Sequence, residues 1–425
     1  MLSKPFSQLT SIVLFLLVLT TGPALGQDLE RVSPEDVGMS SERLERLTLG
    51  MQSYVDQQQI PGSVTLILKD GKLVYESAIG MRDREANAPM ETDNLFRIAS
   101  QTKAIVSTAI MILQEQGKLN IQDPVGKYLP EWMQTTVAVP TEDGYEVIPA
   151  KRAIRIRDLL THTAGVGWGT GPARDVWEEH DMMYWYLADR EEGIREFVRE
   201  LATLPMDAHP GERFVYGLSI DVLGAVVEVT SGQPLDQFLQ SELFQPAGMT
   251  DTHFFVPQDK ASRMAVVYEA TPDGLKRMTD EGHYHGQGHY VDGPRKTFGG
   301  GAGLVSTARD YARFLQMVLN GGSIDGNRIL SPTTVDLMLS DHTGDIDLGP
   351  GRAMGLGFGI VTDLGAYGKA GSLGEFDWGG AYHSRYFVSQ KHRMVVVYLT
   401  QTMMSVGGVD DMDKLNSLAY QAIVE

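Results

Sequence analysis

The sequence predicts an α+β protein in which an antiparallel sheet is built from both termini and flanked by helices, with a second, mainly helical lobe. Three observations predict this arrangement. Strand-forming runs lie near both ends of the chain, the middle is helical and rich in Gly and Pro, and a uniformly apolar helix precedes that middle. We therefore expect a sheet lobe over about residues 27–117 and 301–425, and a helical lobe over about 118–300.

Local patterns predict the elements of the sheet lobe. Residues 40–58 place apolar side chains at helical spacing, which predicts an amphipathic helix. Residues 63–69 and 73–79 are two β-rich runs joined by an Asp-Gly pair, which is a strong hairpin signal. Two further strands and a closing helix over 413–425 are expected at the C-terminus.

The first residues of the chain have the pattern of a secretory leader. Lys4 is followed by an apolar run from Ile12 to Leu19 and by Ala24-Leu25-Gly26, a small-x-small cleavage pattern. The apolar run is too short for a membrane span, so we expect residues 1–26 to be a signal peptide and the mature protein to be periplasmic or secreted. The alternative is an uncleaved anchor.

Composition excludes several classes of function. The chain of 425 residues has a net charge of −19, and loss of Lys4 with the leader takes it to −20. Such an acidic protein is not expected to bind nucleic acid. The chain contains no Cys, which excludes disulfides, thiol nucleophiles and cysteine-ligated metals.

One stretch combines a candidate nucleophile with a candidate amine. Residues 100–116 are apolar nearly all round, which predicts a buried helix with Ser100 at its N-terminus and Lys103 one turn later on the same face. A lysine in a buried helix is costly unless it is paired, and exchanging a proton with Ser100 would give it a partner. The alternative is that Ser100 only caps the helix while Lys103 extends to solvent.

Two further segments supply candidate partners. Tyr216 stands just before an apolar helix, where a neighbouring cation such as Lys103 could make it a proton carrier. Trp378-Gly379-Gly380 leads into a strand, and its two glycines would let a substrate approach the backbone closely. Taken singly, Tyr216 is also explained as a core tyrosine, and the Trp378 element as a Gly-rich turn.

Together these elements resemble the serine β-lactamase and penicillin-binding protein superfamily, in its class C and D-peptidase branch. The order Ser100-x-x-Lys103, Tyr216 and then a Gly-containing strand is that of the family. Supporting segments cover most of residues 35–425: RDLLTHTAGV, HPGERFVYG, FQPAGMTDTHF and GGGAGLVSTARDYARFLQMVLNGG. The resemblance implies one β-lactamase/transpeptidase-like serine hydrolase domain over 27–425.

The chain departs from the family pattern at two elements. Tyr216-Gly217-Leu218 stands where Tyr-x-Asn is usual, and Trp378-Gly379-Gly380 stands where Lys-Thr-Gly or His-x-Gly is usual. An amide and a cation that recognise lactam substrates are thus missing. The pattern resembles that of family VIII carboxylesterases, which implies a carboxylesterase acting on small esters.

The resemblance implies acyl transfer through a covalent acyl-Ser100 intermediate. Lys103 and Tyr216 would act as a coupled pair, and either could be the formal base. Trp378, Gly379 and Gly380 would contact the substrate, and the N–H groups of Ser100 and Ala381 would form the oxyanion hole.

Two rival functions stay open at this stage. A β-lactamase or D-stereospecific peptidase could use Arg385 or His383 in place of the missing cation. A catalytically silent, wall-associated binding module would have the same fold. The expected partner is a small-molecule ester or amide, without nucleic acid and without a membrane span after leader cleavage.

One histidine cluster is a candidate metal site. His283, His285 and His289 lie close together in EGHYHGQGHY. No His-Glu-x-x-His pattern accompanies them, so a loop is the favoured explanation. We expect no metal and no cofactor.

Overall fold

An eight-stranded antiparallel sheet forms the centre of the protein. The computed structural model describes residue 1 and residues 28–280, 286–404 and 409–425. The strands lie in the order β12-β13-β14-β15-β16-β1-β2-β3. Their bounds are β1 Gly62–Lys69, β2 Lys72–Asp83, β3 Ala88–Pro89, β12 Arg352–Met354, β13 Gly359–Val361, β14 Phe376–Gly380, β15 Ser384–Ser389 and β16 Met394–Thr400. The pairing of β1 with β16 confirms the sheet built from both termini.

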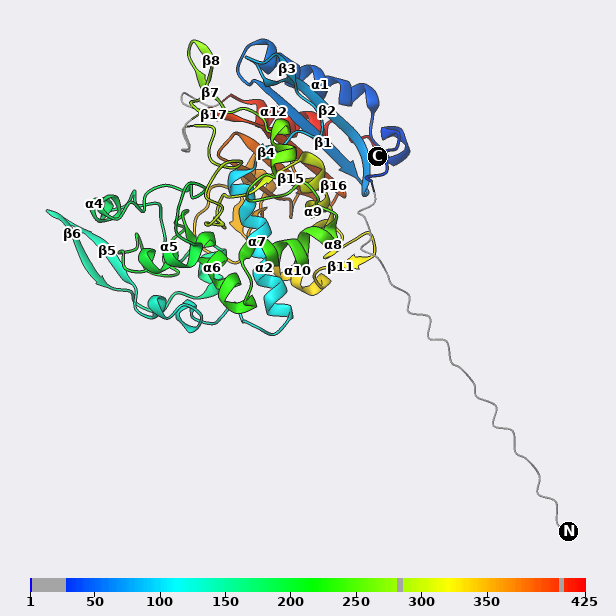
Figure 1. Cartoon of the computed structure of the whole chain (residues 1–425). Coiled ribbons are helices and arrows are strands. Elements are labelled where there is room, and N and C mark those ends of the chain that lie inside the picture. Colours follow the sequence, from blue (N-terminus) through cyan, green and yellow to red (C-terminus); the bar gives the residue numbers. More distant parts are fainter. Residues whose placement is uncertain (2–27, 281–285, 405–408) are drawn as a thin grey trace.

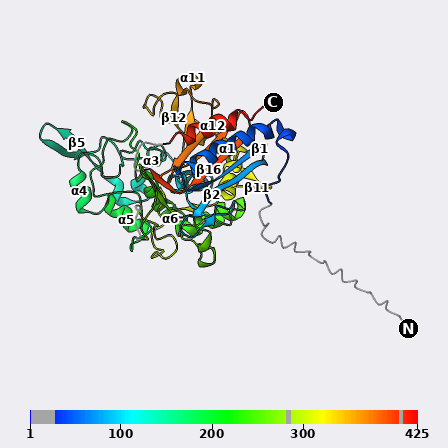
Figure 2. The ribbon, with the colours of Figure 1, turned by 90° about the horizontal axis from the view of Figure 1, so that it is seen from above.

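Helices cover both faces of this sheet. On one face α1 (Ser41–Asp56) and α12 (Asp411–Tyr420) pack side by side over Ile67, Phe387 and Tyr398. On the other face α2 (Thr102–Glu115) and α9 (Ala308–Leu319) belong to a second cluster with Leu66 and Tyr386. Successive side chains of β1 and β15 point to opposite faces of the sheet, so each strand contributes to both hydrophobic clusters. Figures 1 and 2 show α1 and α12 together beside the sheet.

The mainly helical region lies on the α2 side of the sheet (Figure 1). Its helices are α3 Ile156–Leu160, α4 Arg174–Glu179, α5 Ile194–Leu201, α6 Ser219–Ser231, α7 Leu235–Leu239 and α8 Gln245–Ala247. A hairpin of β5 (Thr136–Thr141) and β6 (Gly144–Pro149) projects from this region in both views (Figures 1 and 2). The larger hydrophobic cluster joins α6 to α2 and to the sheet, so one core serves both regions. The division of the chain at residues 117/118 stays a prediction.

The remaining elements are short. They are β4 Phe96–Arg97, β7 Tyr268–Thr271, β8 Gly274–Arg277, β9 Val305–Ser306, β10 Ser323–Ile324, β11 Asn327–Arg328, β17 Thr402–Met404, α10 Pro332–Met338 and α11 Leu364–Tyr367. Within the described ranges, no helix combines the length and apolar character that a bilayer crossing requires. The expected leader, residues 1–26, lies outside the described residues apart from Met1.

The local signals of the sequence correspond closely to the observed elements. The helix expected over 40–58 is α1, and the Ser40 hydroxyl accepts from the Arg43 N–H at 3.3 Å as its N-cap. The Asp-Gly turn joins β1 to β2 with both residues in the left-handed region, as a type I′ turn requires. The helix expected from Ser100 differs, since α2 begins at Thr102 and Ser100 lies in a preceding 3-10 turn.

We expect Leu66→Ala to lower the free energy of unfolding by about 2–5 kcal/mol. Leu66 lies fully buried in the central strand β1, and its truncation leaves a cavity that the surrounding strands cannot fill. Thermal and denaturant unfolding midpoints measure the change. Leu49→Ala is the matched control, because Leu49 of α1 is 62% exposed. Equal shifts in the two variants would contradict the assigned layers.

Candidate active site

Ser100 lies in a strained turn that leads into α2. The 3-10 turn covers Ala99–Gln101, and Ala99 has a φ of +44°, in the left-handed region that side chains other than Gly rarely adopt. Two contacts hold the turn: the Tyr311 hydroxyl donates to the Gln101 carbonyl at 2.9 Å, and the Gln101 amide donates to the Ser384 hydroxyl at 3.1 Å. The surrounding structure thus fixes the direction of the Ser100 side chain.

Lys103 faces Ser100 from the first turn of α2. Its Nζ donates to the Ser100 Oγ at 3.2 Å and to the Gly301 carbonyl at 2.8 Å. The side chain is only 3% exposed, so the alternative in which Lys103 extends into solvent does not describe the structure. A buried ammonium needs such partners. The nucleophile and the amine are therefore within hydrogen-bond reach of each other.

Tyr216 lies under the lysine and is surrounded by aromatic rings. The Lys103 Nζ is 4.7 Å from the centre of the Tyr216 ring, a cation–π contact. His162 and Trp168 contact the same ring, with centroids 4.7 Å and 5.1 Å away. The Trp378 indole N–H donates to the Tyr216 hydroxyl at 3.1 Å. The structure thus brings Ser100, Lys103, Tyr216 and Trp378 into one place.

The end of β14 lies against the segment that carries Ser100. A Cβ on Gly380 would stand 2.5 Å from the Ile98 carbonyl oxygen, so only Gly permits this approach. Gly379 belongs to the same strand, and Ala381 is exposed in the turn between β14 and β15. The predicted oxyanion donor Ala381 therefore stands one residue beyond a strand end that contacts the segment before Ser100.

A carboxylate behind the lysine is part of this arrangement. Asp221 of α6 is 1% exposed, and its Oδ1 accepts from the Gly301 N–H at 2.9 Å. The carbonyl of the same Gly301 accepts from Lys103. Burial raises the pKa of the Asp221 carboxyl to about 6, while the Lys103 charge opposes that rise. Sequence reasoning missed Asp221, because only the fold brings it to Gly301.

His162 is a buried, uncharged side chain that lies against the Tyr216 ring. Burial, and to a lesser extent the charge of Lys103, lowers the pKa of His162 well below its ordinary value. Both ring nitrogens are buried without a hydrogen-bond partner in the described part of the chain. A neutral imidazole against Tyr216 keeps the surroundings of Lys103 apolar and leaves no second cation there.

Comparison with known proteins gives the family. The Beta-lactamase family model matches residues 50–421. The chain belongs to the beta-lactamase family. Esterase EstB of Burkholderia gladioli is 32% identical over 378 residues, which cover 84% of this chain and 90% of EstB. Lovastatin esterase of Penicillium rubens is 27% identical over 388 residues, covering 84% of this chain and 92% of that protein.

Solved structures agree with this assignment. EstCE1, described as a hydrolase with promiscuous acyltransferase activity, superposes with a TM-score of 0.76 at 28% identity, covering 89% of this chain and 98% of EstCE1. The penicillin-binding protein homologue of Pyrococcus abyssi shares the fold with a TM-score of 0.66 at 21% identity, covering 89% of this chain and 77% of that one. This member of the beta-lactamase family is therefore a serine hydrolase of the β-lactamase and esterase type.

Leu218 departs from the family pattern, and Arg385 and His383 are the candidate replacements for the missing cation. The contacts of these three residues show whether they can face a substrate. Leu218 is fully buried in the core at the start of α6, so its position presents no amide to a substrate. Arg385 pairs in register with Gly379, one residue away from the Trp378–Tyr386 pair, and so faces the opposite side of the sheet from Trp378. Arg385 donates to Asp377 at 3.0 Å.

His383 is likewise engaged elsewhere. Its Nε2 lies 2.7 Å from the Asp411 carboxylate of α12, which also accepts from the Tyr398 hydroxyl at 2.7 Å. His383 therefore serves to join the β14–β15 turn to α12. Of the candidate metal cluster, His283 and His285 lie outside the described residues. Within the described residues, no group of three potential ligands is placed to hold a metal ion.

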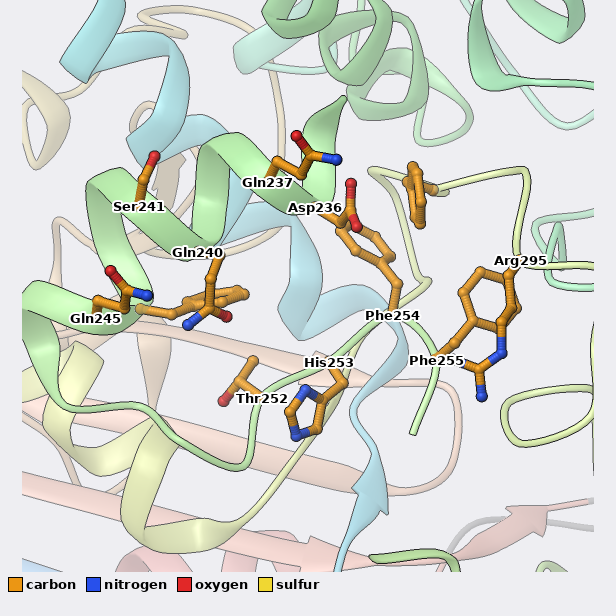
Figure 3. A pocket seen from close by; sticks show the side chains of 12 residues that line it. Asp236, Gln237, Gln240, Ser241, Gln245, Thr252, His253, Phe254, Phe255 and Arg295 are labelled. Atoms are coloured by element: carbon orange, nitrogen blue, oxygen red, sulfur yellow. The ribbon is translucent and has the colours of Figure 1, made fainter. Parts of the chain in front are cut away.

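Two sizeable cavities lie outside the Ser100–Lys103–Tyr216 cluster. One, of about 430 Å³, lies between α7 and the segments around Phe254 and Phe298 (Figure 3). None of the predicted site residues lines it. The other, of about 460 Å³, is lined in part by Trp378 and Gly379. Only the second is contiguous with the candidate active site.

We expect Asp221→Asn to lower kcat by about tenfold or more with little change in KM. The amide oxygen can still accept from Gly301, but the negative charge that balances the Lys103 ammonium is lost. Steady-state kinetics at pH 8 measure the effect. Asp236→Asn is the control, because Asp236 lies at the separate cavity. An unchanged kcat in Asp221→Asn would show that the carboxylate has no role in the site.

Asp221 also predicts a pH dependence of stability. Its pKa of about 6 in the folded protein exceeds the ordinary value near 3.9 of the unfolded chain. The folded state therefore binds this proton more tightly, and the contribution of Asp221 to the free energy of unfolding falls as pH rises from about 4 to about 6. The stability of the wild type relative to Asp221→Asn should fall across this window in denaturant titrations. A constant difference would contradict the raised pKa.

Proposed function

We propose that the protein is an exported carboxylesterase that hydrolyses small esters through an acyl-Ser100 intermediate. The observation that carries the proposal is the position of Trp378. This residue stands where family members usually carry a cation, and its indole N–H binds the Tyr216 hydroxyl. An aromatic side chain there favours uncharged acyl or alcohol groups over the charged group of a lactam or a D-peptide. EstB, an esterase at 32% identity, supports the same choice.

In the first step the Ser100 Oγ attacks the ester carbonyl. The coupled pair of Lys103 and Tyr216 takes the hydroxyl proton, and the Lys103 Nζ lies 3.2 Å from the Ser100 Oγ. Tyr216 lies against Lys103 through its ring, and its hydroxyl accepts from Trp378. The proton then passes from the Lys103–Tyr216 pair to the leaving alcohol. Because the two groups are coupled, the proton belongs to the pair.

The negative charge that develops on the carbonyl oxygen needs donors. We assign this role to the backbone N–H groups of Ser100 and Ala381. The close contact of Gly380 with Ile98 supports the assignment, because it brings the strand end before Ala381 next to the segment before Ser100. Water then attacks the acyl group in the reverse sequence and releases the acid.

The alternative function, that of a β-lactamase or D-stereospecific peptidase, requires a cation near the acyl group of the substrate. Arg385 of β15 is held in an ion pair with Asp377 on the sheet face opposite Trp378, and His383 is hydrogen-bonded to Asp411 of α12. The side-chain amide of the usual Tyr-x-Asn element is also missing, because Leu218 stands at the Asn position and is buried in the core. These positions support ester hydrolysis over lactam hydrolysis.

Export is part of the proposal. The leader pattern of residues 1–26 supports secretion to the periplasm or the medium, and the absence of Cys is compatible with either. Mass measurement of the mature N-terminus from the native host would test cleavage after Gly26. A mature chain that begins at Met1 would contradict it.

We expect Ser100→Ala to lower kcat/KM for p-nitrophenyl butyrate by about a thousandfold or more, because the nucleophile is lost.

Trp378→Phe should keep the aromatic wall but lose the hydrogen bond to Tyr216, which predicts a loss of about tenfold, mainly in kcat. Spectrophotometric assays of p-nitrophenyl butyrate hydrolysis measure kcat and KM of both variants. Labelling with a fluorophosphonate shows whether the nucleophile is present.

The matched control is Ser107→Ala, because Ser107 is buried in α2, the helix that follows Ser100, and has no hydrogen-bond partner in the described structure. Wild-type turnover in Ser100→Ala would rule out the assigned nucleophile. Nitrocefin turned over faster than the ester would favour the lactamase reading, and an unlabelled protein that hydrolyses neither compound would favour a silent binding module.

A further inference from the structure

The cavity of about 430 Å³ between α7 and the segment around Phe254 lies beside an unusual stretch of helix (Figure 3). A π-helical turn over Gln240–Phe244 follows α7 directly, and α8 follows this turn without a break. Such turns are rare and occur frequently at functional sites. Gln240 and Phe244 of the turn line the cavity. Its volume is within the range of small-molecule sites, about 300–1,000 Å³.

Four phenylalanine rings form the apolar part of the cavity wall. Phe244, Phe254 and Phe255 are only 2%, 5% and 8% exposed, so the core holds these rings in place. The Phe298 ring completes the set, with its centroid 5.3 Å from that of Phe254 and 6.1 Å from that of Phe255. Ring edges and faces of this kind pack against another aromatic ring, and the faces also attract cations. The wall therefore favours a ligand with an aromatic body.

One carboxylate in the wall has no counterion. Asp236 belongs to α7, and Figure 3 shows its side chain on the Phe254 side of the cavity. Its Oδ1 is shielded from solvent and accepts no hydrogen bond from any described residue. Burial raises the pKa of this carboxyl, and no cation of the described structure counters the rise. A shielded oxygen without a donor is costly, so a ligand that brings an N–H donor and a positive charge would gain by binding there.

The two basic side chains of the wall do not neutralise Asp236. Burial lowers the pKa of His253 to about 4, so its imidazole is uncharged at neutral pH. Arg295 is engaged beside Phe255: its guanidinium lies 5.7 Å from the centre of that ring and donates to two backbone carbonyls at 3.0 Å and 2.9 Å. Arg295 is also exposed, so water screens its charge. The carboxylate of Asp236 is therefore available to a cation from outside.

A glycine-rich loop separates this cavity from the catalytic lysine. A Cβ on Gly303 would stand 2.9 Å from the Phe254 ring, so the ring packs directly against the loop. Two residues earlier in the same loop, the Gly301 carbonyl accepts from Lys103. Neither Lys103 nor Ser100 lines the cavity. A ligand bound there would therefore leave the nucleophile accessible.

We propose that this cavity is a second binding site, separate from the active site, for a small arylalkyl amine in its ammonium form. The ammonium group donates to Asp236 and supplies the charge that this carboxylate lacks. The aryl group packs against the rings of Phe254 and Phe298. The side-chain carbonyl oxygen of Gln240 is an acceptor for a further N–H of the ammonium group. The inference goes beyond the proposed ester hydrolysis and does not depend on it.

The test compares four ligands that differ in charge or in the ring: 2-phenylethylamine, 2-phenylethanol, 3-phenylpropanoate and butylamine. Calorimetry at pH 7 measures their binding to the wild type. We expect 2-phenylethylamine to bind about tenfold more tightly than 2-phenylethanol, because a charge-assisted hydrogen bond is stronger than a neutral one. Butylamine should bind more weakly than 2-phenylethylamine, because it lacks the ring. Equal binding of the amine and the alcohol, or tighter binding of 3-phenylpropanoate, would overturn the proposal.

Two variants locate the effect. Asp236→Asn should reduce the preference for the amine over the alcohol to about one, while 2-phenylethanol binds as before. Glu242→Gln is the matched control, because Glu242 belongs to the π-helical turn but does not line the cavity, and its carboxylate accepts from Gln116 at 2.9 Å. It removes the same charge, and the preference should persist. A preference that survives in Asp236→Asn, or is lost in Glu242→Gln, would overturn the assignment. Thermal unfolding checks that both variants are folded.

Labelling of Ser100 with a fluorophosphonate distinguishes the two sites. The label blocks the active site, and 2-phenylethylamine should bind the labelled wild type as tightly as the unlabelled protein. Loss of binding on labelling would place the amine in the active site and overturn the second site. Absence of ester hydrolysis would overturn the proposed function but would leave the binding measurements, and the inference drawn from them, unchanged.

Discussion

A buried ammonium group determines how the rest of the site is built. Lys103 lies inside the protein, and burial of a positive charge is costly unless its surroundings compensate for it. The compensation comes from three directions: the Ser100 hydroxyl, the Gly301 carbonyl and the face of the Tyr216 ring. Each group belongs to a different part of the chain. The site is complete only when the sheet, α2 and the helical region are all assembled.

The layers of the fold explain how such distant groups meet. The same face of the sheet that packs on α2 carries Trp378, so the strand end and the helix start converge by ordinary core packing. The opposite face carries Asp377 and Arg385, which alternate with Trp378 and Tyr386 along the two strands. One strand, β14, therefore presents an aromatic face to the nucleophile and a charged face to the cavity of about 460 Å³.

Patterns within short segments predicted much of this structure, and long-range geometry did not follow from them. The Asp-Gly hairpin, the helix α1 and the apolar helix after Ser100 each follow from a few adjacent residues. The pair Ser100 and Lys103 could be predicted because helical spacing alone brings them together. Asp221 could not, because its role depends on a peptide eighty residues away. Nor could the start of α2 at Thr102, which follows a 3-10 turn in which Ala99 has a positive φ.

The burial of Leu218 has a consequence for any redesign of the site. An amide introduced at this position would enter the apolar core without a partner, which costs roughly 1–3 kcal/mol before any gain in recognition. A single Leu218→Asn exchange toward the usual Tyr-x-Asn pattern is therefore opposed by core packing. Redesign of this site would therefore have to change the packing around Leu218 together with residue 218 itself.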